Sequence, residues 1–186
     1  MQVVLENEAL KVTINSFGAE LASIRGKETD TEYLWNADAK FWKRSAPVLF
    51  PFVGSLKNKE YHYEGKTYSM GQHGFARDME FEPVLCDMDE CWYRLKDTPK
   101  TYAVYPFHFE LEVGHRLTGR VIEVIWRVVN PDSGELLFMI GGHPAFQTPQ
   151  GKTIYDYTLS FNKEGSGAEE SAQQLHYLAP NENGYQ

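Results

Sequence analysis

The sequence predicts an all-β fold, arranged as an antiparallel sandwich within a single domain over residues 1–186. Three observations favour this class. Apolar and polar residues alternate with a period of two along several stretches, helical periodicity is nearly absent, and turn signals recur between the apolar stretches. Strands joined by short connections favour antiparallel neighbours over a βαβ arrangement, because parallel strands need a long crossover.

Each expected strand is bounded by turn chemistry. Residues 15–18 separate the first two strands, Glu64-Gly65 closes a tight hairpin, and Asn-Pro-Asp-Ser-Gly at 130–134 is a strong turn. The last expected strand has no predicted neighbour, so we expect a sheet that is incomplete at its C-terminal end. In chain order, the expected strands cover residues 11–14, 20–24, 61–63, 66–68, 107–113, 120–129, 136–140 and 155–161.

Charge and composition exclude several classes of partner. The 26 acidic residues outnumber the 18 basic ones, which gives a formal net charge of −8, and no basic cluster stands out. We therefore expect no nucleic acid and no anionic membrane as partner, whereas a neutral, hydroxyl-rich ligand is compatible with this charge. The N-terminus lacks the apolar stretch of a signal peptide and no apolar run approaches membrane-spanning length, so the expected location is the cytoplasm.

The chain contains two cysteines, Cys86 and Cys91. Their spacing matches neither a zinc motif nor a disulfide framework, and we expect both to be reduced residues of the core or of a sheet edge. No pair of histidines has the spacing of a zinc site, and the sequence contains neither a nucleophile elbow nor a phosphate-binding loop. We expect no metal and no cofactor.

Two of the six histidines have unusual neighbours. His73 lies in M-G-Q-H-G-F-A-R-D and His143 lies in G-G-H-P-A-F, where the adjoining glycines let the backbone approach a ligand closely. Histidine suits proton transfer near neutral pH, so both are candidate acid–base residues. Each is also compatible with an ordinary polar residue at a strand end. The other histidines lack such a setting, and His108 is expected on a solvated face.

Arg44 lies in a stretch over residues 41–54 that is rich in aromatic residues and proline. A guanidinium presents a rigid fork of donors that suits vicinal hydroxyls or a phosphate, and aromatic faces suit the apolar side of a sugar ring. The alternative is a surface arginine beside a core strand.

Four segments, taken in their order, resemble the aldose 1-epimerase (galactose mutarotase-like) superfamily. The similarity points to its LacX-like and hexose-6-phosphate 1-epimerase branches, and it covers the chain to about Phe146. The resemblance implies a galactose mutarotase-like β-sandwich (supersandwich), of which this chain would be the N-terminal two-thirds. The segments are N-S-F-G-A-E-L-A-S-I at 15–24, W-K-R-S-A-P-V-L-F-P-F-V-G at 42–54, Q-H-G-F-A-R-D at 72–78 and G-G-H-P-A-F at 141–146.

This resemblance implies an isomerase of carbohydrate metabolism that interconverts the α and β anomers of an aldose or aldose 6-phosphate without a cofactor. His143 would be the acid that protonates the ring oxygen, and His73 would hydrogen-bond near the anomeric centre. The expected partner is therefore a monosaccharide or a sugar phosphate. The family's substrate-binding positions correspond in this sequence to Arg44, Gln72, Arg77 and Asn58.

The sequence departs from the family in two respects. Asn58 is followed by Lys59, where classical galactose mutarotases carry an arginine, and lysine lacks the planar fork that recognises vicinal hydroxyls. The family's general base, a glutamate followed by proline near the C-terminus, and a sugar-binding aspartate after the His-Pro-x-Phe strand have no counterpart. Glu82-Pro83 is a Glu-Pro pair in the wrong order along the chain.

Three hypotheses follow from the missing base, because an acid–base group contributes roughly 10²–10⁴-fold to a rate. The chain represents an epimerase by lineage, or it is a carbohydrate-binding relative without catalysis. The third hypothesis is an incomplete polypeptide whose open sheet edges lead to self-association.

Overall fold

The computed structural model describes residues 1–148 and 151–158. The chain divides into a unit of residues Met1–Gln147 and a second unit that begins at Thr148. Every strand described below lies in the first unit. None of the helices within the described ranges has the length and apolar character that crossing a membrane requires.

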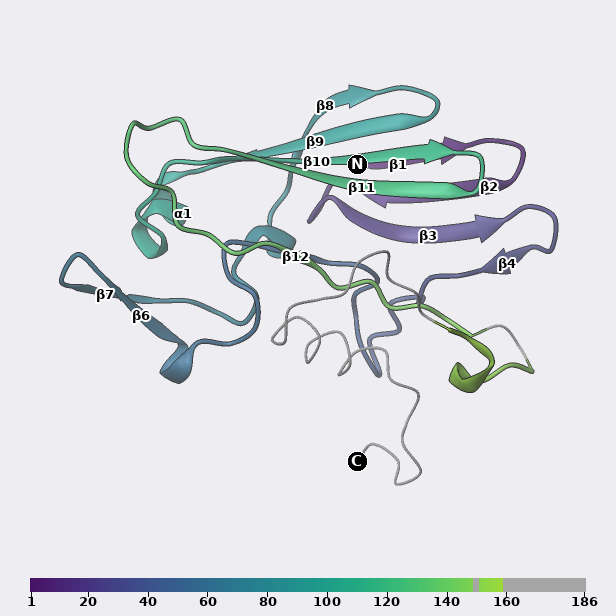
Figure 1. Cartoon of the computed structure of the whole chain (residues 1–186), viewed down its shortest axis with the longest axis horizontal. Helices are drawn as coiled ribbons and strands as arrows, with labels where there is room; N and C mark the ends of the chain where they lie inside the picture. The colour runs from purple at the N-terminus through teal and green to yellow at the C-terminus, as the bar shows by residue number, and fades with distance from the viewer. Residues whose placement is uncertain (149–150, 159–186) are drawn as a thin grey trace. The chain divides into compact units, whose positions relative to one another are not determined.

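Two four-stranded antiparallel sheets form the first unit (Figure 1). The first sheet has the order β1-β2-β3-β4, with strands Gln2–Glu6, Leu10–Asn15, Glu20–Gly26 and Thr31–Glu32. The second has the order β11-β10-β9-β8, with strands Val121–Val129, Glu110–Thr118, Glu90–Lys96 and Glu82–Cys86.

The hydrophobic core lies between these sheets, since β1 contacts both β9 and β10. Leu5 and Val12 from the first sheet are fully buried, as are Tyr93, Leu111 and Val113 from the second. All five belong to one contiguous cluster of buried side chains. This face-to-face arrangement confirms the predicted all-β sandwich, in which apolar side chains alternate toward the inner faces.

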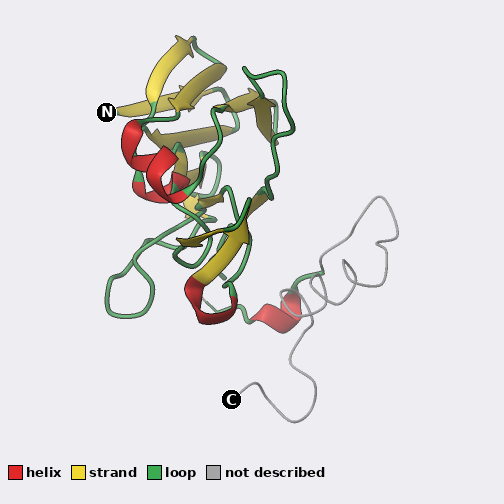
Figure 2. Cartoon of the chain, turned by 90° about the vertical axis from the view of Figure 1, so that its left-hand side faces the viewer, coloured by secondary structure: helices red, strands yellow, loops and turns green. Residues whose placement is uncertain are grey.

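Several short strands and helical segments lie between or after the strands of the two sheets (Figure 2). Two small antiparallel pairs are β5 (Val48–Leu49) with β12 (Gly141–Gly142), and β6 (Glu60–Tyr63) with β7 (Lys66–Ser69). The helical segments are η1 (Lys57–Lys59), η2 (Ala76–Asp78), α1 (Pro99–Val104) and η3 (Ile154–Asp156).

The expected strands at 11–14, 20–24, 61–63, 66–68 and 120–129 are confirmed. The strand expected at 107–113 begins only at Glu110, as β10. The prediction of one domain over residues 1–186 stays a prediction, because residues 149–150 and 159–186 lie outside the described part of the chain.

Two expected strands are wrong. Residues 136–140 join no ladder among the described residues; the Met139 N–H donates instead to the Pro51 carbonyl at 2.9 Å. Residues 154–156 form η3, because the Thr153 N–H donates to the Asp156 carboxylate at 2.7 Å and closes a capping box. The rest of the strand expected at 155–161 falls partly on residues outside the described ranges.

The second sheet is buried unevenly. Strand β10 has neighbours on both sides and is buried along most of its length. Strands β8 and β11 are edges, and β11 leaves Val121, Val124 and Trp126 exposed. Self-association through open sheet edges stays a prediction.

Candidate active site

His73 lies in the loop between β7 and η2, where Gly54 fixes both its backbone and its ring. The His73 N–H donates to the Gly54 carbonyl at 2.8 Å, and the Gly54 N–H donates to His73 Nδ1 at 3.0 Å. Because Nδ1 accepts a hydrogen bond, the neutral imidazole carries its proton on Nε2. In this tautomer Nε2 is the donor atom of the ring.

The loop reaches Gly54 through an unusual backbone conformation. His73 and Gly74 both have positive φ, at 66° and 72°. A side chain at position 74 would place its Cβ 2.2 Å from the Phe50 carbonyl oxygen. That carbonyl accepts from the Phe75 and Ala76 N–H groups at 3.0 and 3.1 Å. Glycine is therefore required for the loop to close on Phe50, and this closure positions His73.

His143 follows β12 and is fixed by backbone hydrogen bonds to residues far away in the sequence. Its N–H donates to the Pro47 carbonyl at 3.1 Å, and two residues later the Ala145 N–H donates to the Ser45 carbonyl at 2.8 Å. On its other side, the Ala145 carbonyl accepts from the Trp35 N–H at 2.9 Å. The segment that carries His143 is thus held between two neighbouring segments.

The two predicted histidines are brought together by this arrangement. The ring centroids of His73 and His143 are 6.0 Å apart in an edge-on geometry. Trp42 packs against His143 with centroids 5.2 Å apart, and both histidines are only partly buried. Two imidazoles and an indole therefore share one partly open site. Donor, acceptor and apolar face are all present, which suits a ring-shaped polar ligand.

Arg44 lies beside this site, in a network of charged groups. Its Nη1 donates to the Arg77 carbonyl at 2.9 Å and lies 3.6 Å from the Glu20 carboxylate, while Nη2 pairs with Asp78. The same Glu20 carboxylate accepts from the Ser45 N–H at 2.6 Å. The guanidinium thus joins the start of β3 to η2, the segment that follows the His73 loop.

Arg77 extends the network toward His73. Its Nη2 donates to the Gln72 carbonyl at 2.8 Å, and its Nε lies 3.6 Å from Asp78. Two guanidinium groups face two carboxylates, those of Glu20 and Asp78, so their charges offset one another locally. Substrate binding by Arg44 and Arg77 stays a prediction, because the contacts described here are within the protein.

The remaining predicted residues are exposed. Gln72 adjoins His73, and its carbonyl rather than its side chain makes the contact described above. Asn58 lies on the 3₁₀ segment η1 at a φ of 57°. Their roles in substrate binding stay predictions.

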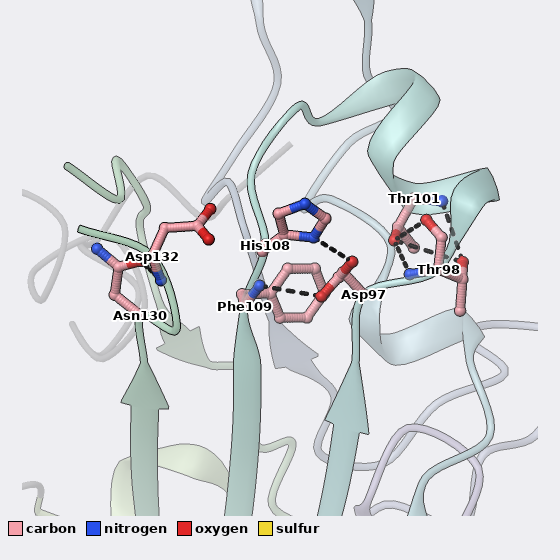
Figure 3. Close-up of polar contacts among 7 residues, drawn as sticks. All are labelled: Asp97, Thr98, Thr101, His108, Phe109, Asn130 and Asp132. Carbon is pink, nitrogen blue, oxygen red and sulfur yellow. Dashed lines mark hydrogen bonds and ion pairs between the residues drawn. The ribbon is translucent and has the colours of Figure 1, made fainter. Parts of the chain in front are cut away.

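The other histidines lie elsewhere in the fold. His108 is exposed, as expected, and its Nδ1 is 2.7 Å from the Asp97 carboxylate, which also accepts from the Phe109 N–H (Figure 3). His115 is buried in the core, and His176 lies outside the described residues. Over the described ranges, no group of three or more His, Cys, Asp or Glu side chains could hold a metal ion.

Sequence reasoning missed three contributors to the site. Trp42, Glu20 and Asp78 all lie within the family-like segments, but no pattern in the sequence assigns a partner to any of them. Each has a partner more than twenty residues away in the chain, as for Glu20 and Ser45, which are separated by 25 residues. Only the folded arrangement reveals these contacts.

Comparison with known proteins agrees with the resemblance found in the sequence. Residues 1–175 match the family described as aldose 1-epimerase. The chromosomal LacX protein of Lactococcus lactis subsp. lactis is 34% identical over 171 residues, which cover 88% of this chain and 57% of that protein. The chain therefore spans little more than half the length of this relative.

Two solved structures share the fold. A galactose mutarotase related enzyme from Lactobacillus acidophilus has a TM-score of 0.81 and 44% identity, and the match covers 84% of this chain and 53% of that one. A galactose mutarotase-like protein from Lactobacillus casei has a TM-score of 0.76 and 37% identity, with 78% and 50% covered. The match covers about half of each of these two proteins.

Proposed function

The chain belongs to the aldose 1-epimerase family, and from that premise we propose that His73 and His143 form the acid–base centre of a mutarotase. The substrate would be an aldose whose α and β anomers are interconverted. The observation that carries the proposal is the pairing of the two imidazole rings, with centroids 6.0 Å apart, beside the indole of Trp42.

The reaction breaks and re-forms the bond between C1 and the ring oxygen of a pyranose. In our proposal, protonated His143 gives its proton to the ring oxygen as this bond breaks, and the anomeric hydroxyl loses its proton as C1 becomes an aldehyde. His73 donates a hydrogen bond from Nε2 to the anomeric oxygen, a role supported by its Nδ1 accepting from Gly54. Rotation about C1–C2 then exposes the other face to ring closure.

The proton of the anomeric hydroxyl requires an acceptor. The resemblance to the family assigns this purpose to a glutamate near the C-terminus of family members, and this chain spans 57% of the length of LacX. We propose that His143 and His73 supply the acid and the hydrogen-bond donor of this step, whichever group accepts the proton.

We further propose an unphosphorylated aldose as the preferred ligand. Arg77 contacts the His73 loop through the Gln72 carbonyl, and the charges of Arg44 and Arg77 face the carboxylates of Glu20 and Asp78. A phosphate would have to compete with two carboxylates that are already in place. The net charge of −8 also disfavours an anionic ligand.

The second candidate function is sugar binding without catalysis. The pairing of two imidazoles beside the indole of Trp42 supports it, since these groups can position a sugar whether or not proton transfer follows. Saturable binding of a monosaccharide without faster mutarotation would identify this case.

Polarimetry of freshly dissolved α-D-glucose and α-D-galactose tests the proposal. We expect the protein to accelerate mutarotation above a buffer blank and His143→Gln to remove the acceleration. His62→Gln serves as a matched control, because His62 lies on the exposed hairpin and pairs with Thr67 at 2.9 Å. Glucose 6-phosphate, measured in parallel, should be converted no faster than glucose.

Each result has a distinct meaning. Equal acceleration by the wild type and by His143→Gln would contradict the acid role of His143. Absence of acceleration together with saturable glucose binding that His73→Ala abolishes would establish the binding function instead. Absence of both would exclude the two candidates for this chain.

A further inference from the structure

Cys86 and Cys91 face each other across the hairpin formed by β8 and β9. The register of the two strands pairs them directly, next to the pair Leu85 and Trp92. Both are free thiols, and they differ in access: Cys86 is exposed, whereas Cys91 is fully buried. The proposal developed below is independent of the sugar site.

The hydrogen-bond pattern of the hairpin places the two sulfurs on its closest approach. The Asp87 N–H donates to the Glu90 carbonyl at 2.8 Å, which makes Asp87 and Glu90 the hydrogen-bonded pair that closes the turn. Hydrogen-bonded and non-hydrogen-bonded pairs alternate along an antiparallel ladder, so Cys86 and Cys91 form a non-hydrogen-bonded pair. Cα atoms in such pairs are about 4.5 Å apart, within the range of about 4.4–6.8 Å that a disulfide accepts.

We propose that Cys86 and Cys91 form a reversible dithiol–disulfide pair that exchanges with small-molecule disulfides such as oxidised glutathione. The bond would close a loop of only a few residues, so it would add little constraint to the unfolded chain. Because β8 is an edge strand and Cys86 is exposed, reductants can reach this bond. A labile, exchangeable disulfide is therefore expected here rather than a structural one.

The difference in access sets the order of the two exchange steps. The thiolate of Cys86 attacks one sulfur of glutathione disulfide, forms a mixed disulfide and releases one glutathione thiolate. The Cys91 thiol then loses its proton, and its sulfur attacks the Cys86 sulfur, forming the Cys86–Cys91 bond and releasing the second glutathione. The two cysteines lose two electrons in total, and the glutathione disulfide gains them.

The buried partner controls the second step. Burial raises the pKa of the Cys91 thiol to about 12, and the neighbouring Cys86 adds to this shift. As long as the pH lies below that pKa, each increase of one pH unit therefore raises the thiolate fraction of Cys91 about tenfold. Formation of the Cys86–Cys91 bond should therefore become faster as the pH rises. The first exchange step, at exposed Cys86, does not depend on Cys91.

Equilibration of the folded protein in glutathione buffers tests the proposal. Samples are quenched with acid, alkylated in denaturant and weighed by intact mass spectrometry. In the more oxidising buffers we expect a monomer that has lost two hydrogens and accepts no alkyl group. In the reducing buffers, two alkyl groups per chain are expected.

Variants separate the two steps. Cys91→Ser should stop as a glutathione adduct on Cys86, and Cys91→Ala repeats this test without a hydroxyl in the core. Cys86→Ser should keep one thiol that is alkylated only after unfolding, and circular dichroism checks that each variant is folded. The proposal is overturned if the wild type keeps two free thiols in every buffer. A wild type that ends as the Cys86 adduct, or as a disulfide-linked dimer, would overturn it equally.

Discussion

His108 and His115 belong to the same stretch of chain, yet their surroundings shift their pKa values in opposite directions. His108 precedes β10, with 49% of its side chain exposed, and its hydrogen bond to Asp97 raises its pKa. His115 lies within β10 and is 1% exposed, and burial lowers its pKa to about 4. The charged imidazole is favoured at one position and opposed at the other.

The difference teaches that depth, more than residue type, decides what a histidine does in this sheet. His115 pairs with Cys91 on β9 and with Val124 on β11, and its ring lies 6.5 Å from that of Tyr93. Among the described residues, no hydrogen-bond partner lies near its Nδ1. His73 and His143 occupy an intermediate position, because they are partly buried and face each other.

The two shifts predict opposite effects of pH on stability. The lowered pKa of His115 means that the unfolded chain takes up a proton more readily, so stability is lost as pH falls from about 6.5 toward about 4. The raised pKa of His108 stabilises the fold below the ordinary histidine pKa. This stabilisation is lost as pH rises through the folded-state value.

The largest effect is expected from His115→Leu, which removes the buried titrating group. Relative to pH 8, the wild type should lose about 2 kcal/mol at pH 5 that the variant does not lose, given the pKa of about 4. Urea unfolding followed by tryptophan fluorescence measures the difference. His62→Gln, on the exposed hairpin, should keep the wild-type dependence. Parallel curves for the wild type and His115→Leu would contradict the burial argument.

The burial of His115 has a signal in the sequence. Leu111, Val113, His115 and Leu117 follow one another at a period of two and are all buried on one face of β10. Continuing the alternation from residue 113 would have placed His115 in the core. The hairpin at Glu64-Gly65 was predictable because its turn is local, with φ values of 47° and 74°.

Other features could not be read from local patterns. Residues 136–140 are apolar enough for a strand, but pairing depends on a neighbour. The Met139 N–H donates to the Pro51 carbonyl, which lies outside the described strands. Helix α1 was missed although Thr98 and Thr101 form its capping box and Pro99 is its first residue. The histidine pair was anticipated through the family resemblance, whereas the contact of Trp42 with His143 depends on the tertiary fold.

A smaller effect of opposite sign is expected from His108→Gln. The wild type should exceed this variant in stability by more at pH 5.5 than at pH 8.5, because the Asp97 contact favours the charged imidazole. The effect should be smaller than that of His115→Leu, since His108 is exposed and solvent screens the pair. Urea unfolding at the two pH values measures it. An advantage that grows with pH would contradict the assigned direction.

The smallest change, Asp97→Asn, removes the charge but keeps an oxygen that can accept from the Phe109 N–H. We expect the pKa of His108 to fall toward its ordinary value, because the hydrogen bond to Asp97 is the main cause of the shift. Titration of the histidine ring protons by NMR measures this, with His62 as an internal control. If the pKa of His108 stayed raised, Asp132, which also contributes and appears beside it in Figure 3, would be its principal partner. The raised pKa of His108, and with it the contrast with His115, would then depend on Asp132 in the turn at 130–134 rather than on Asp97 after β9.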